Sequence, residues 1–470
     1  MKTRIEHDLI GNKEVPIDAY YGVQTARAQD NFHISHSTLA RFPIFISALA
    51  KVKKASALAN FELGLLDEKN KDAICQASDE VMAGKFNDHF VVDMMQGGAG
   101  TSTNMNANEV ICNRALEILG HKKGEYTHLH PNNHVNLSQS TNDAYPTALR
   151  IALYERIFSL VDSMRVLSKS FEKKAREFDD VIKMGRTQLQ DAVPMTLGQE
   201  FQTYATMLNE DILRLTEAQN LVCEMNLGAT AIGTGINSHP DYARVAEQKL
   251  QEVTGRPFVT AGDLVEATQD TGAYVQISGV LKRVATKVSK ICNDLRLLSS
   301  GPRTGFNEIN LPAMQPGSSI MPGKVNPVIP EVVNQVSFQV IGCDMTITMA
   351  SEGGQLQLNV FEPVIAFNLF YQMQIMENAY YTLAEKCVDG ITANKERCHE
   401  LVINSIGLVT ALNPHIGYDN STNIAKEALE TGKSVYEIVL EQKLLTKDEL
   451  DNIIKPENMI KPIDLSKINK

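Results

Sequence analysis

Apolar side chains recur every three or four positions through long stretches of this chain of 470 residues. That spacing places them on one face of an α-helix. The longest repeat runs from Asp143 to Asp180, and Asn142 or Asp143 can cap its N-terminus. A helix of about 33 residues is roughly 50 Å long, well beyond the usual three turns. Similar repeats cover 197–215, 277–298 and 365–383, and a further helix is expected after Pro330.

Helices of this length need neighbours of similar length, because a single helix cannot bury its own apolar stripe. No strand-like runs separate the repeats in the central part of the sequence. The pattern therefore predicts an all-α fold, a bundle of long helices. Stripes wider than one face within the chain could also join subunits, so we expect a homo-oligomer.

The two ends of the chain are less regular than its centre. Glycine and proline interrupt the first part, which also carries short β-prone pieces such as Tyr20–Val23. After about residue 395 the helical repeats become shorter. We expect an N-terminal domain at 1–140, a central long-helix bundle domain at 141–395 and a small C-terminal domain at 396–470.

Composition narrows the class of partners and the compartment. The net charge of −11 argues against binding to nucleic acid or to an anionic membrane. The seven cysteines are widely spread and form no C-x-x-C pair, which is typical of free, buried thiols in a reducing compartment. The sequence starts without an apolar signal segment and has no run of eighteen apolar residues. We therefore expect a soluble cytoplasmic protein.

The segment Gly301–Pro327 breaks the helical pattern between two long helices and predicts an extended loop. Long loops inside compact domains are usually functional or disordered. This one carries hydroxyl, ammonium and amide groups suited to a carboxylate or phosphate: Ser318, Ser319, Lys324 and Asn326. Its glycine spacing, and the valine after the lysine, do not match a nucleotide P-loop. A flexible surface linker is the alternative interpretation.

Three other segments gather small and polar residues at predicted helix ends: Gln96–Asn104, Ser138–Asn142 and Gly185–Gln188. A helix N-terminus favours anions, although caps and turns are the ordinary role of such residues. The segments contain neither a metal-ligand cluster nor a carboxylate pair. His128, His130 and His134 match no standard zinc spacing and are expected to be structural, so no metal ligand is assigned.

Two motifs carry a resemblance to a known family. GSSIMPGKVNP at 317–327 and HPNNHVNLSQSTNDAYPTA at 130–148 resemble conserved blocks of the aspartase/fumarase superfamily. The resemblance continues from RIEHDLIG through YYGVQTARA to NPHIGYDNSTNIAKEAL, and so covers essentially the whole chain. QGGAGTSTNMNANE and SQSTND are similar to the aspartase branch, whereas class II fumarases usually have QTGSGTQSNMN and SQSSND. Gln188 stands where fumarases and some aspartases have histidine, which argues against a fumarase.

The resemblance implies a homotetramer with a central multi-helix core and a small-molecule substrate. The implied reaction is the reversible elimination of ammonia from L-aspartate to give fumarate. No organic cofactor is then required, although Mg²⁺ activates some bacterial members. A class II fumarase is the main alternative, and a non-catalytic helical scaffold is a remote one.

The resemblance also implies roles for individual residues. Ser318 would be the base that removes the Cβ proton, although the residues alone do not distinguish it from Ser319. The remaining roles are substrate binding: Thr101, Ser140, Thr141 and Ser319 for the β-carboxylate, Thr187, Lys324 and Asn326 for the α-carboxylate, and Asn142 with Gln188 for the amine. The segments with Thr101, Thr187 and Ser318 would come from three different subunits, which makes each active site composite.

Overall fold

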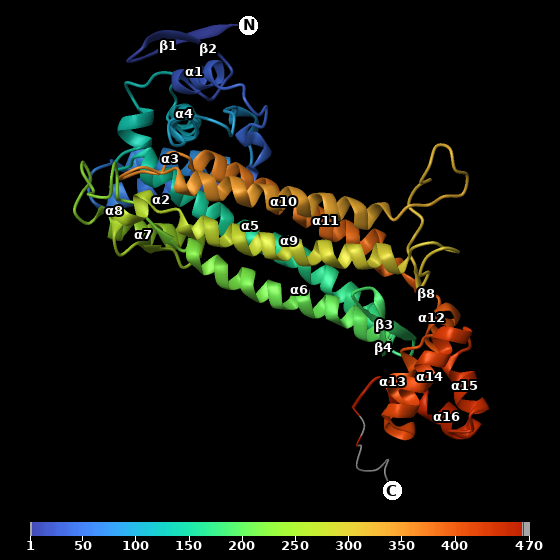
Figure 1. Cartoon of the computed structure of the whole chain (residues 1–470). Coiled ribbons are helices and arrows are strands. Elements are labelled where there is room, and N and C mark those ends of the chain that lie inside the picture. Colours follow the sequence, from blue (N-terminus) through green and yellow to red (C-terminus); the bar gives the residue numbers. More distant parts are fainter. Residues whose placement is uncertain (1, 463, 465–470) are drawn as a thin grey trace. The chain divides into compact units, whose positions relative to one another are not determined.

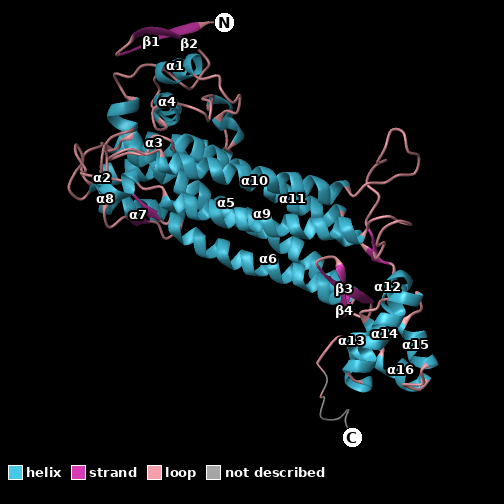
Figure 2. Cartoon of the chain, in the orientation of Figure 1, coloured by secondary structure: helices cyan, strands magenta, loops and turns pink. Residues whose placement is uncertain are grey.

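The computed structural model describes residues 2–462 and 464, and helices dominate it (Figures 1 and 2). The helices are α1 (Val23–Asn31), α2 (Pro43–Glu62), α3 (Glu68–Met82), α4 (Thr101–Ile118), α5 (Thr141–Glu177), α6 (Leu197–Gln219), α7 (Tyr242–Thr254), α8 (Leu264–Gln269), α9 (Gly272–Leu298), α10 (Val328–Glu352), α11 (Glu362–Lys386), α12 (Lys395–Ile403), α13 (Leu408–Ile416), α14 (Tyr418–Thr431), α15 (Val435–Glu441), α16 (Lys447–Ile453) and α17 (Pro456–Met459). Single turns of 3₁₀-helix lie at Leu39–Arg41, Asn87–His89, Asn220–Val222 and Val388–Gly390, and a π-helical turn, η3, lies at Pro131–Val135.

The strands form only small two-stranded sheets. They pair as β1 (Thr3–Asp8) with β2 (Gly11–Pro16), β3 (Ile182–Thr187) with β4 (Gln190–Thr196), β5 (Glu224–Met225) with β6 (Val259–Thr260), and β7 (Ile309–Asn310) with β8 (Thr392–Ala393). The β5–β6 pair is parallel and the other three are antiparallel. The predicted all-α class is confirmed, because these four small sheets are a minor part of a mainly helical chain.

The five long helices α5, α6, α9, α10 and α11 lie where the apolar repeats predicted them. The stripe of α5 is fully buried at Leu149, Leu153, Ile157, Leu160, Met164, Leu167 and Phe171. The predicted caps of α5 are wrong, since Ser140 is the N-cap residue: its Oγ accepts the Asn142 N–H at 3.2 Å. Asp143 instead accepts the Ser140 N–H at 2.9 Å. Tyr20–Val23 is not a strand, and the β1–β2 hairpin was not predicted.

The chain divides into two compact units, each assembled from three separate segments. Unit 1 contains the described residues of Met1–Val161, Leu213–Arg283 and Phe338–Met376, and unit 2 those of Asp162–Ile212, Val284–Ser337 and Glu377–Lys470. Each unit therefore holds a stretch of all five long helices. The three domains expected from the sequence, at 1–140, 141–395 and 396–470, are each one continuous stretch of the chain, unlike these units. That division stays a prediction.

Unit 1 is packed around aromatic side chains of different helices. The Phe45 ring of α2 lies 5.3 Å from the rings of Tyr145 in α5 and Phe370 in α11, between centroids. Between α9 and α10, the Ser278 hydroxyl donates to a buried Asp344 carboxylate oxygen at 2.8 Å. These contacts hold segments far apart in sequence against one apolar centre.

Unit 2 follows the same scheme with a second, smaller core. Phe171 of α5 packs against Phe201 and Tyr204 of α6, and the amide of Asn334 in α10 donates to the Ser289 hydroxyl of α9 at 2.9 Å. The C-terminal helices enclose buried residues of their own, including Leu408, Leu412, Ile424, Ile438 and Val439.

None of the described helices is long and apolar enough to cross a membrane. All seven cysteines are free, as predicted; six are buried and Cys75 is partly exposed.

A buried ionic cluster in unit 2 ties the β3–β4 hairpin to the loop that follows α9. Glu308 is completely buried, and its carboxylate oxygens lie 2.7 Å from Arg186 Nη1 and 3.0 Å from Lys183 Nζ. The Arg186 guanidinium also lies over the Phe306 ring, 4.1 Å from its centroid. Burial alone would lower the pKa of Lys183, but the carboxylates of Glu200 and Glu308 raise it above its usual value. The cluster therefore favours the charged form of Lys183 inside the protein.

We expect Glu308→Ala to destabilise the chain by about 3–5 kcal/mol, because it leaves the buried Lys183 and the partly buried Arg186 without their shared partner. Thermal unfolding would measure the loss as a lower melting temperature. Asp180→Ala is the matched control, since it removes an exposed ion pair with Lys395 and should cost about 1 kcal/mol or less. Equal melting temperatures for the two variants would contradict a structural role for the cluster.

Candidate active site

The start of α4 is shaped by three consecutive residues with positive φ. Gly98, Ala99 and Gly100 have φ values of 87°, 55° and 89°. A Cβ at Gly100 would lie 2.4 Å from the Tyr145 ring, so only glycine lets the start of α4 approach the first turns of α5. Thr101 is exposed as the first residue of α4, and its hydroxyl donates to the Gly98 carbonyl at 2.8 Å.

The polar residues Ser140, Thr141 and Asn142 at the start of α5 lie beside the start of α4. The Thr141 hydroxyl oxygen accepts an N–H from the Asn104 amide at 3.2 Å. The Asn142 amide donates to the Ala231 carbonyl at 2.8 Å. Together with the Ser140 cap, these bonds give each of the three side chains a defined partner. Unit 1 thus brings together the N-termini of two helices, where the helix dipoles favour negative charge.

Asp143 fastens this segment to a loop from another part of the chain. Its second carboxylate oxygen accepts the N–H groups of Gly228 and Thr230 at 3.1 and 3.0 Å. Burial raises the pKa of Asp143 to about 6, although backbone hydrogen bonds and Lys53 oppose the rise. Both carboxylate oxygens are therefore used to hold the backbone around Ser140 and Thr141 in place, and they are not directed at a ligand.

Lys53 is a fully buried supporting residue that the sequence analysis did not identify. Its ammonium donates to the side-chain oxygens of Asn104, Asn136 and Gln139 at 2.6, 3.0 and 2.8 Å. Burial lowers the pKa of Lys53 to about 7, and the Asp143 charge opposes the fall. The sequence could have indicated its burial, because Lys53 lies four residues after Leu49, on the apolar face of α2.

A polar cavity of about 560 Å³ adjoins Ser140 in unit 1. Its lining is rich in amides and hydroxyls: Asn132, Asn133, Asn136, Ser138, Gln139, Ser140, Thr230 and Asn237. A cavity of this size is sufficient for a small molecule. Two larger cavities, of about 1000 and 960 Å³, contain none of the predicted site residues.

In unit 2, Thr187 and Gln188 occupy the tip of the β3–β4 hairpin. Gln188 and Leu189 connect the strands with φ values of 53° and 62°, and Thr187 pairs with Gln190. Both φ values are positive, as the common two-residue hairpin turn requires. The segment is therefore a strand end and a tight turn rather than a simple connection between helices. It exposes Thr187 and Gln188 to solvent.

The predicted loop at 301–327 is confirmed, apart from the two residues of β7. Within it, 317–326 closes on itself: the Gly317 N–H donates to the Lys324 carbonyl, and the Asn326 amide donates to the Gly317 carbonyl, both at 2.8 Å. A Cβ at Gly317 would lie 2.8 Å from the Asn326 nitrogen and the Lys324 oxygen. Glycine is thus required for this closure. Ser319 and Lys324 are exposed on the closed loop.

The loop distinguishes the two adjacent serines. Ser318 Oγ accepts the backbone N–H groups of Ile320 and Met321 at 3.2 and 3.0 Å. Two N–H dipoles directed at one oxygen stabilise negative charge on it. The residue pattern alone did not separate Ser318 from Ser319, because the distinction depends on the path of the backbone.

The predicted site residues fall into two groups. Unit 1 holds Thr101, Ser140, Thr141 and Asn142, while unit 2 holds Thr187, Gln188, Ser318, Ser319, Lys324 and Asn326. Within unit 1 the residues gather at two helix starts. Within unit 2 they lie on a hairpin tip and a closed loop, whose bases are joined through Arg186 and Glu308.

Two of the three histidines considered in the sequence make local structural contacts. His130 Nδ1 accepts the N–H of Asn132 at 3.1 Å at the start of η3, and His134 Nδ1 accepts the His130 N–H at 2.8 Å. These bonds engage the Nδ1 atom of each ring in the local backbone structure. His128 lies apart from them, in contact with His121.

Comparison with known proteins gives the chain a family. The model of the family described as "Lyase" matches residues 11–342, and that of the "Fumarase C C-terminus" matches 408–461. Three curated relatives named aspartate ammonia-lyase are 66% (Helicobacter pylori), 61% (Pseudomonas aeruginosa) and 59% (Escherichia coli) identical. Each alignment covers 98% of this chain and 96–98% of the relative.

Solved structures agree in fold. A Brucella melitensis protein described as "fumarate lyase:delta crystallin", bound to cobalt, is 54% identical with a TM-score of 0.96, covering 98% of this chain and 100% of that one. A class II fumarase from Schistosoma mansoni is 38% identical with a TM-score of 0.92, covering 97% and 99%. The family resemblance of the motifs is therefore confirmed, and the chain belongs to the aspartase/fumarase superfamily of lyases.

Proposed function

We propose that this protein catalyses the reversible elimination of ammonia from L-aspartate to give fumarate. The observation that carries the proposal is 59–66% identity, over nearly the full chain, to enzymes named aspartate ammonia-lyase. Identity to the class II fumarase is lower, at 38%. The site must hold two carboxylates and an amine while a base removes a weakly acidic Cβ proton.

The hydroxyls at the start of α5 suit the β-carboxylate, on which charge builds as the proton leaves. Ser140 Oγ and Thr141 Oγ1 each accept an N–H, so each hydroxyl hydrogen can be donated to an anion. Donors aimed at developing charge usually supply the largest catalytic term. Thr101 and Ser319 complete the proposed set, and the Thr101 hydroxyl must turn from the Gly98 carbonyl to take part.

Ser318 is the proposed base. Its Oγ takes the Cβ proton, and the C–H electron pair passes into the β-carboxylate to form an aci-carboxylate dianion. Collapse of the dianion breaks the Cα–N bond, releasing ammonia and leaving fumarate. The two N–H groups on Ser318 Oγ support this role, because they stabilise the alkoxide that must first form.

The other end of the substrate would meet Thr187, Lys324 and Asn326. One N–H of the Asn326 amide closes the loop, and its second can be donated to the α-carboxylate. The Lys324 side chain is exposed and carries the charge that pairs with this carboxylate. Asn142, with Gln188, would orient the amine: its Nδ2 bonds Ala231, which leaves Oδ1 to accept from an ammonium group.

The proposed chemistry needs no organic cofactor, because a base, hydrogen-bond donors and one cation perform it. Mg²⁺ is retained as a candidate activator, to be tested by assays with and without a chelator. A cytoplasmic location is also proposed, and it is supported by the seven free cysteines.

A strong preference for L-aspartate over L-malate is expected. A site built to pair a charged amine leaves polar groups unpartnered with a hydroxyl substrate, and such mismatches can reach 10⁴–10⁵ in kcat/KM. Initial rates with each substrate, followed by the absorbance of fumarate, give this ratio directly. Comparable kcat/KM values would instead identify a fumarase, and no activity with either substrate would favour the scaffold alternative.

Ser318→Ala should lower kcat by about 10²–10⁴ while leaving the fold intact, as expected for loss of a general base. Ser319→Ala is the matched variant: it removes one of several donors to the developing charge and should lower kcat by a smaller factor. Circular dichroism and thermal unfolding would verify both folds. Near-normal turnover by a correctly folded Ser318→Ala variant would exclude Ser318 as the base.

We further propose a homotetramer whose active sites combine segments of different subunits. One support is an exposed apolar stripe on α10, formed by Phe338, Ile341, Met345 and Met349, which are 40–67% exposed. Their spacing of three and four residues puts them on one helix face, the kind of surface that a second copy covers. Another support is α5, which runs for 37 residues between the Ser140 and Thr187 segments and spans about 55 Å.

Mixing two inactive variants tests the composite site. After Ser140→Ala and Thr187→Val tetramers are dissociated and reassociated together, random assortment should leave about a quarter of the sites with both residues intact. Aspartase activity should therefore reappear from two inactive parents. Each variant taken alone through the same treatment is the control. Proven mixed tetramers without activity would show that both residues act within one chain.

A further inference from the structure

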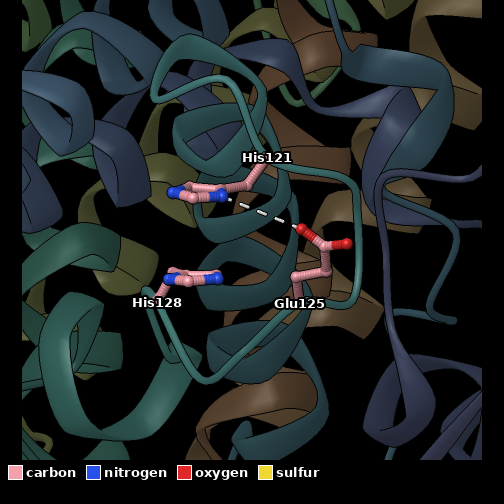
Figure 3. A group of neighbouring side chains, drawn as sticks. All are labelled: His121, Glu125 and His128. Carbon is pink, nitrogen blue, oxygen red and sulfur yellow. Dashed lines mark ion pairs between the residues drawn. The ribbon is translucent and has the colours of Figure 1, made fainter.

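Three side chains outside the proposed active site converge just beyond the end of α4. Figure 3 shows the rings of His121 and His128 lying one above the other, with a nitrogen of each directed towards the Glu125 carboxylate. The ring centroids are 3.8 Å apart and the planes differ by 7°. The nearest Glu125 oxygen lies 3.8 Å from His121 Nδ1. One candidate ligand atom from each side chain lies within 4.8 Å of the other two.

We propose that His121, Glu125 and His128 form a binding site for one divalent transition-metal ion, such as Zn²⁺, Co²⁺ or Ni²⁺. Two imidazoles and a carboxylate are a donor set that such ions bind, with water completing the coordination. Metal–nitrogen distances near 2.1 Å bring tetrahedral ligands to about 3.4 Å from one another. Because the stacked rings direct their nitrogens in parallel, at least one ring must also turn to face the ion, and the exposed side chain of His128 has room to do so. The site is independent of the proposed function and departs from the sequence analysis, which assigned no metal ligand.

The backbone already positions the three ligands. The N–H of His121 donates to the Leu116 carbonyl at the end of α4, at 2.9 Å. The His128 N–H donates to the Glu125 carbonyl at 3.1 Å, and the next residue, Leu129, is fully buried. Little ordering of the chain would therefore accompany binding, which favours affinity.

The charges around the cluster also permit a cation. Glu125 supplies a negative ligand, and its carboxylate accepts a neutral backbone N–H, from Lys122, at 3.0 Å. The nearby Lys123 ammonium lies 3.7 Å from a Glu117 oxygen and 4.1 Å from the centroid of the Tyr20 ring, so its charge is engaged elsewhere. The histidines prefer transition metals to Mg²⁺, which selects oxygen ligands.

The ion would close the short loop between α4 and η3. Residues 121–128 connect the helix that begins with Thr101 to the turn that lines the cavity beside Ser140. A ligand that binds only the folded state stabilises it. The metal should therefore raise the melting temperature without taking part in the proposed reaction.

Titration of the untagged, chelator-stripped full-length protein with Co²⁺ tests the site. Visible absorption and calorimetry should report one Co²⁺ ion per chain. An excess of Mg²⁺ should not displace the bound Co²⁺. His121→Ala/His128→Ala should weaken binding by about tenfold or more and abolish the rise in melting temperature. His399→Ala is the control, because it removes an exposed histidine of α12 and should bind Co²⁺ as the parent does.

Aspartase activity measured without metal should be the same in the parent and in the double variant, which verifies that the variant is folded. Equal Co²⁺ affinity of the two proteins would overturn the proposal, as would the absence of stoichiometric binding by the parent. A double variant that fails to fold would be replaced by Glu125→Gln. This variant keeps the bond to the Lys122 N–H and should still lose affinity and the thermal shift.

Discussion

The rest of the structure depends on the burial of the apolar stripe of α5. A helix of 37 residues gains little stability alone, so its stripe must be covered along its whole length. Sections of α6, α9, α10 and α11 accompany it in both compact units, and aromatic pairs such as Phe171 with Phe201 fill the spaces between them. The long helices therefore form together, and the connecting segments must start and end where the helices do.

In unit 1 the polar site groups lie at helix ends, because packing occupies the helix interiors. A helix N-terminus has N–H groups without partners inside the helix, and these must be satisfied by side chains, loops or ligands. Ser140 and Asp143 meet this need at the start of α5. At the start of α4 the Gly98 carbonyl accepts the Thr101 N–H, and the Gln96 side-chain oxygen accepts the Thr103 N–H. The same unsatisfied groups that require caps also attract carboxylates. Structural and proposed catalytic roles therefore share the same few residues.

Buried charge holds these ends in place. Lys53 and Asp143 lie beneath the polar segment of unit 1, and Glu308 joins Arg186 to Lys183 beneath the hairpin and loop of unit 2. Such groups are expensive to bury, so they are found with several hydrogen-bond or ionic partners. Each network fixes a segment whose exposed side chains would otherwise have many orientations. The segments that carry the proposed active-site groups are therefore held from the protein interior by hydrogen bonds and ion pairs.

The sequence by itself determined the five long helices, the all-α class and the loop at 301–327, because these depend on local spacing of apolar residues and on helix breakers. Its motifs also pointed to the superfamily and to the candidate residues. Only the tertiary structure decided which groups meet: that Ser140 caps α5, that Ser318 receives the two N–H groups, that Lys53 supports the site, and that His128 pairs with His121 rather than with His130. These outcomes depend on backbone path and on contacts between distant segments, which the spacing of residues along the chain does not encode.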